Sequence, residues 1–303
     1  NSDKQGVRVL LALSQIPPQP CVAAAELLAT LLQKRPVHSC MPTYEEWAAK
    51  LFCYRHGTDV PPRMLALPDG ERGHALPKAK ARMRMTFDEG RQWYTLMMLS
   101  RRYLEWGAGG TTVVTAWRAL HPSLPAIEAH TVESDAMFLG DLRNETRDIR
   151  RAEQRGLLAL HQADLGQLNA LWGAPKNWTA RPLATRLAQA SSYVQTISNA
   201  SGCCFDTILI DGRFRQACAL QALRLAHDHT IMVMHDFWMP NWPHRKLMPH
   251  RRHYNVTVDR WYEHVQRVDS LAVMRPRAGS IAAAKANTPE FQLAFARVTD
   301  DPS

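Results

Sequence analysis

The sequence predicts an α/β fold, a doubly wound and mostly parallel sheet that follows an N-terminal helical extension. Short apolar runs alternate with stretches of helical period from residue 85 onward, which is typical of parallel strands joined by crossover helices. Glycines directly follow the first apolar run, and polar side chains follow several of the others. The expected organisation is an extension at 1–84, the sheet domain at 85–278 and a C-terminal tail at 279–303.

The extension contains two stretches with helical spacing. Apolar side chains in residues 21–33 recur at three and four, and residues 43–55 open with a Thr and two acidic residues, as a helix start does. Proline, glycine and charged residues dominate 57–80, which predicts a long loop.

The sheet domain alternates predicted strands and helices in a regular order. Strands are expected at 102–106, 126–134, 156–164, 205–212 and 230–237, and helices at 86–100, 112–121, 135–155, 186–198 and 215–227. In such sheets ligands bind beyond the carboxyl ends of the strands. The unusual residue clusters of this sequence stand at those ends.

The composition bounds the classes of partner. The 303-residue chain carries a net charge of +9 with a pI near 9.5, which favours an acidic partner. Its positive residues are scattered apart from 147–155 and 244–253, and no RNA-recognition signature or zinc-finger spacing accompanies them, so no specific nucleic-acid partner is expected. No run of about eighteen apolar residues is present, so a membrane is expected to matter only through an anchor outside this chain.

Sequons indicate the compartment. Four of the eight asparagines stand in N-x-[ST] sequons, namely Asn144, Asn177, Asn199 and Asn255, where chance would give roughly one. This excess predicts a glycoprotein of the secretory pathway, in the Golgi lumen or outside the cell. Six cysteines without a C-x-x-C pair argue against a structural zinc site, and their even number permits disulfides in such a compartment.

The segment LEWGAGGTT places a glycine-rich turn after the first strand. Gly107, Gly109 and Gly110 let backbone N–H groups at a helix start approach a ligand. Thr112 stands where a dinucleotide fingerprint has its third glycine, and Glu105 would repel a pyrophosphate but attract an amino group. The pattern disfavours a nicotinamide dinucleotide and predicts the aminoacyl end of S-adenosylmethionine. The alternative is a turn that only packs strand against helix.

Two further acids follow the next strands. Glu133 ends the second strand, one helix and one strand after the glycine turn, where a carboxylate can accept hydrogen bonds from both ribose hydroxyls of a nucleoside. Asp164 ends the third strand and suits the adenine amino group. Either residue taken alone reads as an ordinary exposed acid, so the spacing carries the prediction.

The motifs LEWGAGGTT, VESD, WGAP, FDTILIDGRFRQACALQAL and MVMHDF follow one another within residues 85–277. In this order they resemble class I S-adenosylmethionine-dependent methyltransferases. More narrowly, the chain looks like a methyltransferase-like group of algae and other eukaryotes that is distantly similar to plant polysaccharide O-methyltransferases. The resemblance implies a seven-stranded Rossmann-like methyltransferase sheet. It also implies that S-adenosylmethionine contacts Glu105, Gly107, Gly109, Glu133 and, on a weaker match, Asp164. The first eighty residues match nothing in this group.

Three polar residues form the candidate catalytic group. Asp211 ends the fourth strand, and His235 and Asp236 end the fifth, beside the position of the reactive methyl group in this fold. A hydroxyl is a poor nucleophile near neutral pH, so His235 is expected to act as the base, with Asp211 sharing or orienting that role. A capping histidine is the alternative. The same three side chains form a candidate divalent-metal site, which would lower the pKa of the acceptor instead.

The long aromatic and basic loop at 237–254 emerges beside this group. Trp238 and Trp242 suit stacking on a sugar ring, whereas Arg213 and Arg251 suit carboxylates or sulfates; a packed loop with solvated arginines is the alternative. Together with the sequons, these residues predict an O-methyltransferase that modifies a hydroxyl of a carbohydrate or glycoconjugate. A non-catalytic subunit with the methyltransferase fold, serving interaction or structure, is the second hypothesis. A nicotinamide-dependent oxidoreductase is disfavoured.

Overall fold

The structure, a computed structural model, describes residues 85–122, 124–168, 175–197, 204–238 and 254–299. The predicted extension at 1–84 lies outside these residues, and so does most of the aromatic and basic loop. Within the described ranges, no helix combines the length and the apolar character that crossing a membrane requires.

A seven-stranded mixed sheet organises the domain, in the order β3-β2-β1-β4-β5-β7-β6. Its strands are β1 (Arg102–Trp106), β2 (Glu128–Glu133), β3 (Leu158–Gln162), β4 (Phe205–Ile210), β5 (Ala226–Met234), β6 (Tyr262–Val268) and β7 (Leu271–Pro276). The first five strands are parallel, whereas β7 runs antiparallel to both β5 and β6. The strand order reverses between β1 and β4, the point at which doubly wound sheets bind their ligands.

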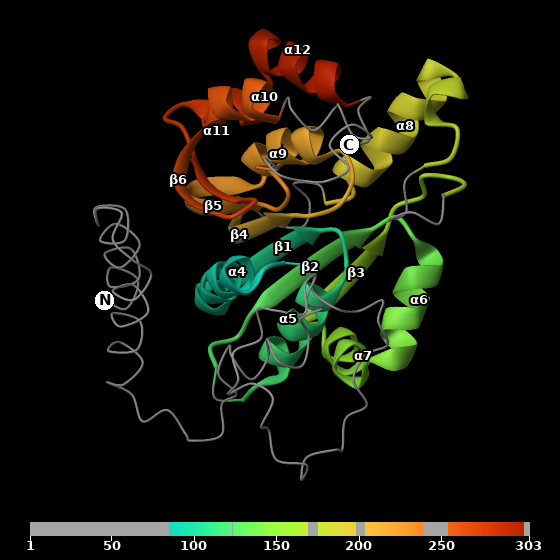
Figure 1. Cartoon of the computed structure of the whole chain (residues 1–303), viewed down its shortest axis with the longest axis vertical. Helices are drawn as coiled ribbons and strands as arrows, with labels where there is room; N and C mark the ends of the chain where they lie inside the picture. Colours follow the sequence, from blue (N-terminus) through green and yellow to red (C-terminus); the bar gives the residue numbers. More distant parts are fainter. Residues whose placement is uncertain (1–84, 123, 169–174, 198–203, 239–253, 300–303) are drawn as a thin grey trace. The chain divides into compact units, whose positions relative to one another are not determined.

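Helices cover both faces of the sheet, with α4 to α7 on one face and α8 to α12 on the other (Figure 1). They are α4 (Phe87–Leu99), α5 (Gly110–Leu120), α6 (Ala136–Glu145), α7 (Arg147–Gln154), α8 (Leu183–Val194), α9 (Arg215–Arg224), α10 (Tyr254–Trp261), α11 (Ser280–Lys285) and α12 (Pro289–Val298), with a 3-10 turn, η4 (Trp178–Ala180), before α8. The predicted doubly wound α/β fold is confirmed.

The core explains why the inner strands read as continuous apolar runs. Tyr103 of β1 enters the core beneath α4 to α7, and its neighbour Leu104 enters the core beneath α8 to α12. In β4, Leu209 and Ile210 divide in the same way. Successive side chains of a strand point to opposite faces, so a strand covered on both faces needs apolar residues at nearly every position.

Most element boundaries differ from the prediction by a few residues, and two of the differences have a clear physical reason. The helix expected at 135–155 is divided into α6 and α7 at Thr146, whose extended backbone (φ −120°, ψ 106°) cannot continue a helix. Strand β5 begins at Ala226, inside the expected helix end. There the Thr230 hydroxyl donates to the Phe205 carbonyl at 2.6 Å, so contact with β4 overrides the local helical pattern.

The C-terminal half contributes elements that the sequence did not identify. Strands β6 and β7 carry no clear alternation of their own, and β7 is placed by its pairing with β5. Helices α11 and α12 lie within the stretch expected to be a tail, and Ala284, Phe291 and Val298 of these helices are buried in the same core as α9. This stretch is therefore packed on the sheet domain.

Candidate functional site

Two glycines lie in close contact at the ends of β1 and β4, at the switch point of the sheet. Gly107 has φ +98°, and a Cβ there would lie 2.7 Å from the Gly212 backbone nitrogen. A Cβ on Gly212 would overlap the hydroxyl of the buried Tyr193 and would lie 2.9 Å from the Gly107 nitrogen. The two turns approach so closely that neither position has room for a side chain. Gly107 is therefore required by the fold itself.

Gly109 is different. Its φ of 171° is extended backbone that any residue adopts, and a Cβ built on it meets no protein atom within 4 Å. Neither packing nor conformation requires glycine, so the position faces open space next to the N-terminus of α5, whose first residue is Gly110. Backbone N–H groups at such a terminus are available to a ligand.

Glu105 lies behind this turn, fully buried. Its Oε1 accepts hydrogen bonds from the hydroxyls of Thr112 and Thr131 (2.9 Å for Thr131), and its Oε2 accepts one from Tyr103 at 2.9 Å. Burial raises the pKa of Glu105 to about 7, although these hydroxyls act in the opposite direction. Side chains of the same chain thus enclose the Glu105 carboxylate behind the turn, and its contact with an amino group stays a prediction.

Thr112 connects the buried acid to the turn. Its hydroxyl oxygen accepts a hydrogen bond from the Gly109 N–H at 2.9 Å while its proton goes to Glu105. The residue at the place of the missing third glycine therefore fixes the conformation of the turn. Through Thr112, the buried Glu105 stabilises the conformation of the turn.

Glu133, half-buried at the end of β2, holds the turn from the side. Its Oε2 accepts a hydrogen bond from the Ala108 N–H at 3.0 Å, and its Oε1 accepts from the N–H groups of Ser134 (2.6 Å) and Asp135 (3.0 Å). Asp164 lies beyond β3, exposed, and accepts a hydrogen bond from the Gly166 N–H at 2.7 Å. Both acids stand at the carboxyl edge, as predicted.

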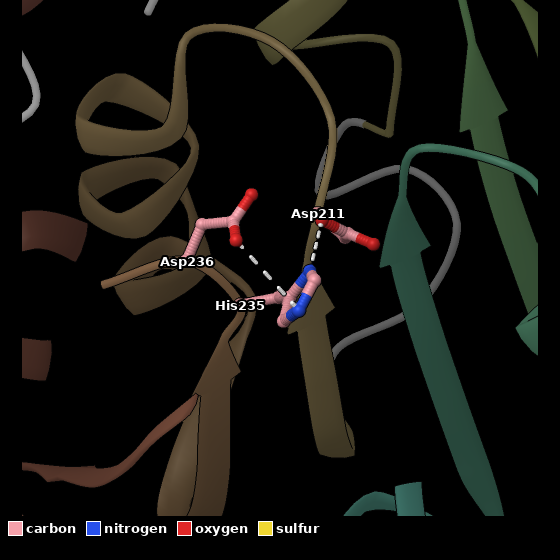
Figure 2. A group of neighbouring side chains, drawn as sticks. All are labelled: Asp211, His235 and Asp236. Atoms are coloured by element: carbon pink, nitrogen blue, oxygen red, sulfur yellow. Dashed lines mark hydrogen bonds and ion pairs between the residues drawn. The ribbon is translucent and has the colours of Figure 1, made fainter. Parts of the chain in front are cut away.

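The predicted catalytic residues converge at the ends of β4 and β5, and Figure 2 shows them together. Asp211 Oδ1 lies 2.8 Å from His235 Nδ1, and Asp236 Oδ1 lies 3.8 Å from His235 Nε2. Asp236 adopts φ +58°, a left-handed conformation that is costly outside glycine and recurs at functional sites. The Asp211 side chain is 30% exposed, whereas that of His235 is 5% exposed.

Two further residues belong to this cluster in roles that the sequence did not reveal. Glu89 of α4 places Oε2 3.5 Å from His235 Nε2, and its Oε1 accepts hydrogen bonds from the N–H and hydroxyl of Ser270. Arg215, the first residue of α9, forms ion pairs with Asp211 (3.2 Å) and Asp236 (3.4 Å). Glu89 reads in sequence as the third residue of a capping box, and Arg215 reads as a solvated helix start.

Charge pairing determines the protonation of the cluster. Burial alone would lower the pKa of His235, but Asp211, Asp236 and Glu89 raise it well above its ordinary value of 6.5. Burial alone would raise the pKa of Glu89, but its bonds to His235, Ser270 and Thr86 lower it to about 2. The raised pKa favours the imidazolium form of His235. An imidazolium cannot accept a proton, so this shift disfavours His235 as the base.

The cluster does not fit a divalent metal. Ligand atoms of Asp211, His235 and Asp236 lie within 4.8 Å of one another, which is close enough for a shared ion. However, the buried guanidinium of Arg215 already bonds both carboxylates, and His235 Nδ1 faces Asp211. Arginine stays protonated in proteins, so a second cation would meet a fixed positive charge.

The predicted acceptor and glycan residues are only partly described. The Trp238 ring contacts the Phe237 ring (4.8 Å between centroids) and the Arg267 guanidinium (5.0 Å from the centroid), so it is engaged with its own chain. Arg213 donates its backbone N–H to the Tyr193 hydroxyl at 3.2 Å. Trp242, Arg251 and the sequon Asn199 lie outside the described residues; Asn144 and Asn177 are exposed, and Asn255 lies in α10.

The sequence matches no protein-family model and no curated protein. Among solved structures, a methyltransferase-like protein from Silicibacter pomeroyi DSS-3 superposes with a TM-score of 0.50 at 19% identity, over 74% of this chain and 99% of that one. An O-methyltransferase from Bacillus cereus in complex with SAH gives a TM-score of 0.40 (18% identity; 64% and 83% of the two chains). The O-methyltransferase TomG from Streptomyces achromogenes in complex with SAM gives 0.41 (16%; 65% and 82%). The seven-stranded sheet with its flanking helices is a Rossmann-like methyltransferase fold.

Proposed function

We propose that the chain is an S-adenosylmethionine-dependent O-methyltransferase. The observation that carries the proposal is the glycine turn at the switch point. There Gly109 faces open space, although neither packing nor backbone conformation requires a glycine. The turn stands at the start of a helix, at the edge where this fold binds ligands. Two acids, Glu133 and Asp164, follow the neighbouring strands.

The chain's own residues suit the parts of this cofactor. Glu133 and Thr112 hold the backbone of Ala108 and Gly109, and Glu105 fixes this turn through Thr112. Glu133 Oε2 receives one hydrogen bond from the turn, so it has capacity to accept another from a ribose hydroxyl. When bound, the cofactor would supply an activated methyl group for in-line transfer to an acceptor oxygen.

Proton removal from the acceptor then falls to Asp211. The raised pKa of His235 favours its protonated form, and Asp211 is the more exposed of the two side chains. Among the described residues, hydrogen bonds to the Asp211 carboxylate reach Oδ1, and Figure 2 shows its other oxygen turned away from His235. Asp211→Asn should lower turnover by about a hundredfold or more while leaving cofactor affinity within about threefold. Turnover equal to that of the parent would remove Asp211 from this role.

The proposed acceptor is a carbohydrate or glycoconjugate in the secretory pathway. The net charge of +9 favours an acidic glycan. Cys204 is disulfide-bonded, with its partner outside the described residues, which supports an oxidising compartment. Asn144 and Asn177 are exposed, as glycan attachment requires. Expression in a eukaryotic secretory host with and without glycosidase treatment tests this: unchanged mass at all four sequons would contradict it.

A non-catalytic subunit is the second candidate. The carboxylates of Glu105 and Glu89 are fully satisfied by hydrogen bonds within the chain, an arrangement that stabilises the fold without any ligand. A structural protein with this fold would keep such networks. Cofactor binding separates the two candidates.

Calorimetric titration with S-adenosylmethionine, with NADH as control, tests the proposed function. The parent should bind S-adenosylmethionine with micromolar affinity and should not bind NADH. Gly109→Ser should weaken that binding at least about tenfold, since a side chain would fill the open space, whereas serine is a good residue at a helix N-cap and should leave Tm unchanged. Equal affinity in this variant would contradict the assigned place. No binding by folded protein would favour the non-catalytic subunit.

A further inference from the structure

Arg215 is held by a site built for a cation. Its Nε donates to the Gly212 carbonyl at 3.1 Å, and its Nη1 donates to the His235 carbonyl at 2.5 Å. Its Nη2 faces Asp211 Oδ1 at 3.2 Å and Asp236 Oδ2 at 3.4 Å. Its side chain is only 8% exposed. Every nitrogen of the guanidinium therefore has an oxygen partner, and the ends of β4 and β5 supply all of them.

This position is the one that a shared metal ion would need. The two carboxylates that could ligate a divalent cation are the same two that bind the guanidinium. A cation between them would stand a few ångströms from a permanent positive charge, which costs more in a buried setting than in water. Removing the arginine from its carbonyl partners would leave those buried oxygens unsatisfied.

The histidine of the group is also committed. His235 Nδ1 lies 2.8 Å from Asp211, and its Nε2 lies 3.5 Å from Glu89, which is 2% exposed. A metal would need one of these nitrogens unprotonated and facing it. The ring has carboxylates on both sides instead, as expected of a residue that bridges α4 to the strand ends.

We propose that Arg215 is a built-in cation that takes the place of a divalent metal at the ends of β4 and β5, so that this site works without metal. Arg215 is almost wholly buried, so it is a positioning residue: it holds Asp211 and Asp236 in the geometry that a metal would otherwise impose. The part of this inference that concerns methyl transfer rests on the proposed function. The part that concerns metal binding does not.

Binding of Mn²⁺ to the purified full chain, followed by electron paramagnetic resonance, tests the metal-binding part without any need for turnover. The parent and Asp236→Asn should both bind Mn²⁺ no more tightly than about 1 mM, as expected without a preformed site. Arg215→Met keeps the length of the side chain and removes its charge, so its affinity should rise at least about tenfold. The double variant Arg215→Met with Asp236→Asn should lose that gain.

Two results would overturn the proposal. One is micromolar Mn²⁺ binding by the parent that Asp236→Asn abolishes, and the other is a folded Arg215→Met variant with no gain in affinity. Should Arg215→Met fail to fold, the parent and Asp236→Asn decide alone. Arg215→Lys, which keeps the charge but loses the planar fork, should stay as insensitive to Mn²⁺ as the parent.

Turnover provides the second arm. After treatment with EDTA, the rate with S-adenosylmethionine and an accepted substrate should stay within about twofold of the untreated rate, and added Mg²⁺ should not raise it. A tenfold loss that Mg²⁺ restores would overturn metal independence. A protein without turnover in either condition contradicts the proposed function alone, because the Mn²⁺ result stands separately.

Discussion

The two halves of the carboxyl edge treat buried carboxylates in opposite ways. At β1 and β2, Glu105 is surrounded by neutral hydroxyls, and burial raises its pKa to about 7. At β4 and β5, Glu89 is just as buried, but His235, Ser270 and Thr86 lower its pKa to about 2. Burial disfavours the charged form in both places, so the partners decide the outcome.

This difference bears on what each half can bind. Among the described residues, no ion pair reaches Glu133, so the first half keeps a carboxylate that no cation of the protein neutralises. The second half supplies its own cations, Arg215 and His235. A positively charged cofactor is attracted to the first half, and a metal ion finds its place in the second half already taken.

The largest predicted effect is a loss of stability when a side chain is placed between the turns that follow β1 and β4. Gly107→Ala should lower the free energy of unfolding by about 3 kcal/mol or more, since its Cβ would lie 2.7 to 2.8 Å from backbone atoms of Asp211 and Gly212, at a φ that side chains rarely adopt. Urea denaturation measures the change. Backbone atoms cannot move aside as the end of a flexible side chain can.

Gly140→Ala is the matched control. Gly140 lies within α6, and a Cβ there meets nothing within 4 Å. Alanine should therefore stabilise the helix by up to about 1 kcal/mol. Equal stability of the two variants would show that the close contact between the turns at β1 and β4 is absent.

The second effect is that Glu105 and Glu89 contribute to stability with opposite dependence on pH. The pKa of Glu105 is raised from 4.5 to about 7, so its contribution to stability is complete below pH 4.5 and declines as pH rises to about 7. The pKa of Glu89 is lowered from 4.5 to about 2, so its contribution is present above pH 4.5 and is lost as pH falls to about 2. Each of these pKa differences corresponds to about 3 kcal/mol in the free energy of unfolding.

Urea denaturation across pH 2–8 separates the two residues. Glu105→Gln should flatten the decline between about pH 4.5 and 7, and Glu89→Gln should flatten the decline on the acid side. Each variant serves as the control for the other, because both remove a buried carboxylate and keep its shape. Parallel curves for Glu105→Gln and the parent over pH 4.5–7 would contradict the raised pKa.

The sequence predicted those site residues that directly follow a strand, because the carboxyl ends of parallel strands meet at one edge of the sheet. Asp211, His235 and Asp236 each follow an apolar run, so a parallel sheet must bring them to one edge. Glu89 reaches the same cluster from a helix before the first strand, across a contact that no local pattern encodes. Its capping-box signal was visible, but not the fact that its Oε2 also faces His235.

The protonation state of the cluster was equally hidden. An isolated histidine suggests a base, whereas the carboxylates of Asp211, Asp236 and Glu89 raise the pKa of His235 and favour its charged form. Strands β6 and β7 were missed because neither shows a clear alternation of polar and apolar residues. The sequence YEHVQRV is half polar because β6 is an edge strand, paired only with β7, so its apolar signal is weak.

A moderate effect is expected from loosening α4. Thr86 caps this helix: its hydroxyl accepts the Glu89 N–H at 3.3 Å, and Glu89 Oε2 accepts the Thr86 N–H at 2.7 Å. Thr86→Ala should cost about 1 kcal/mol in the free energy of unfolding, whereas Thr86→Ser keeps the hydroxyl and should cost less. Chemical denaturation of both variants decides; equal losses would mean that the hydroxyl does not act as the cap.

The smallest effect tests the outer end of the first half. Asp164 is exposed and bonds only the Gly166 N–H among the described residues, so Asp164→Asn keeps an oxygen for that bond and removes the charge. Stability should stay within about 0.5 kcal/mol. Affinity for S-adenosylmethionine should fall by about two- to tenfold if the carboxylate accepts the adenine amino group, since a single hydrogen bond contributes about 0.5–1.5 kcal/mol. Calorimetric titration with S-adenosylmethionine and with its inosine analogue makes the assignment specific. An analogue without that amino group should bind the parent and the variant equally, and a variant that weakens both ligands alike would place Asp164 away from the base.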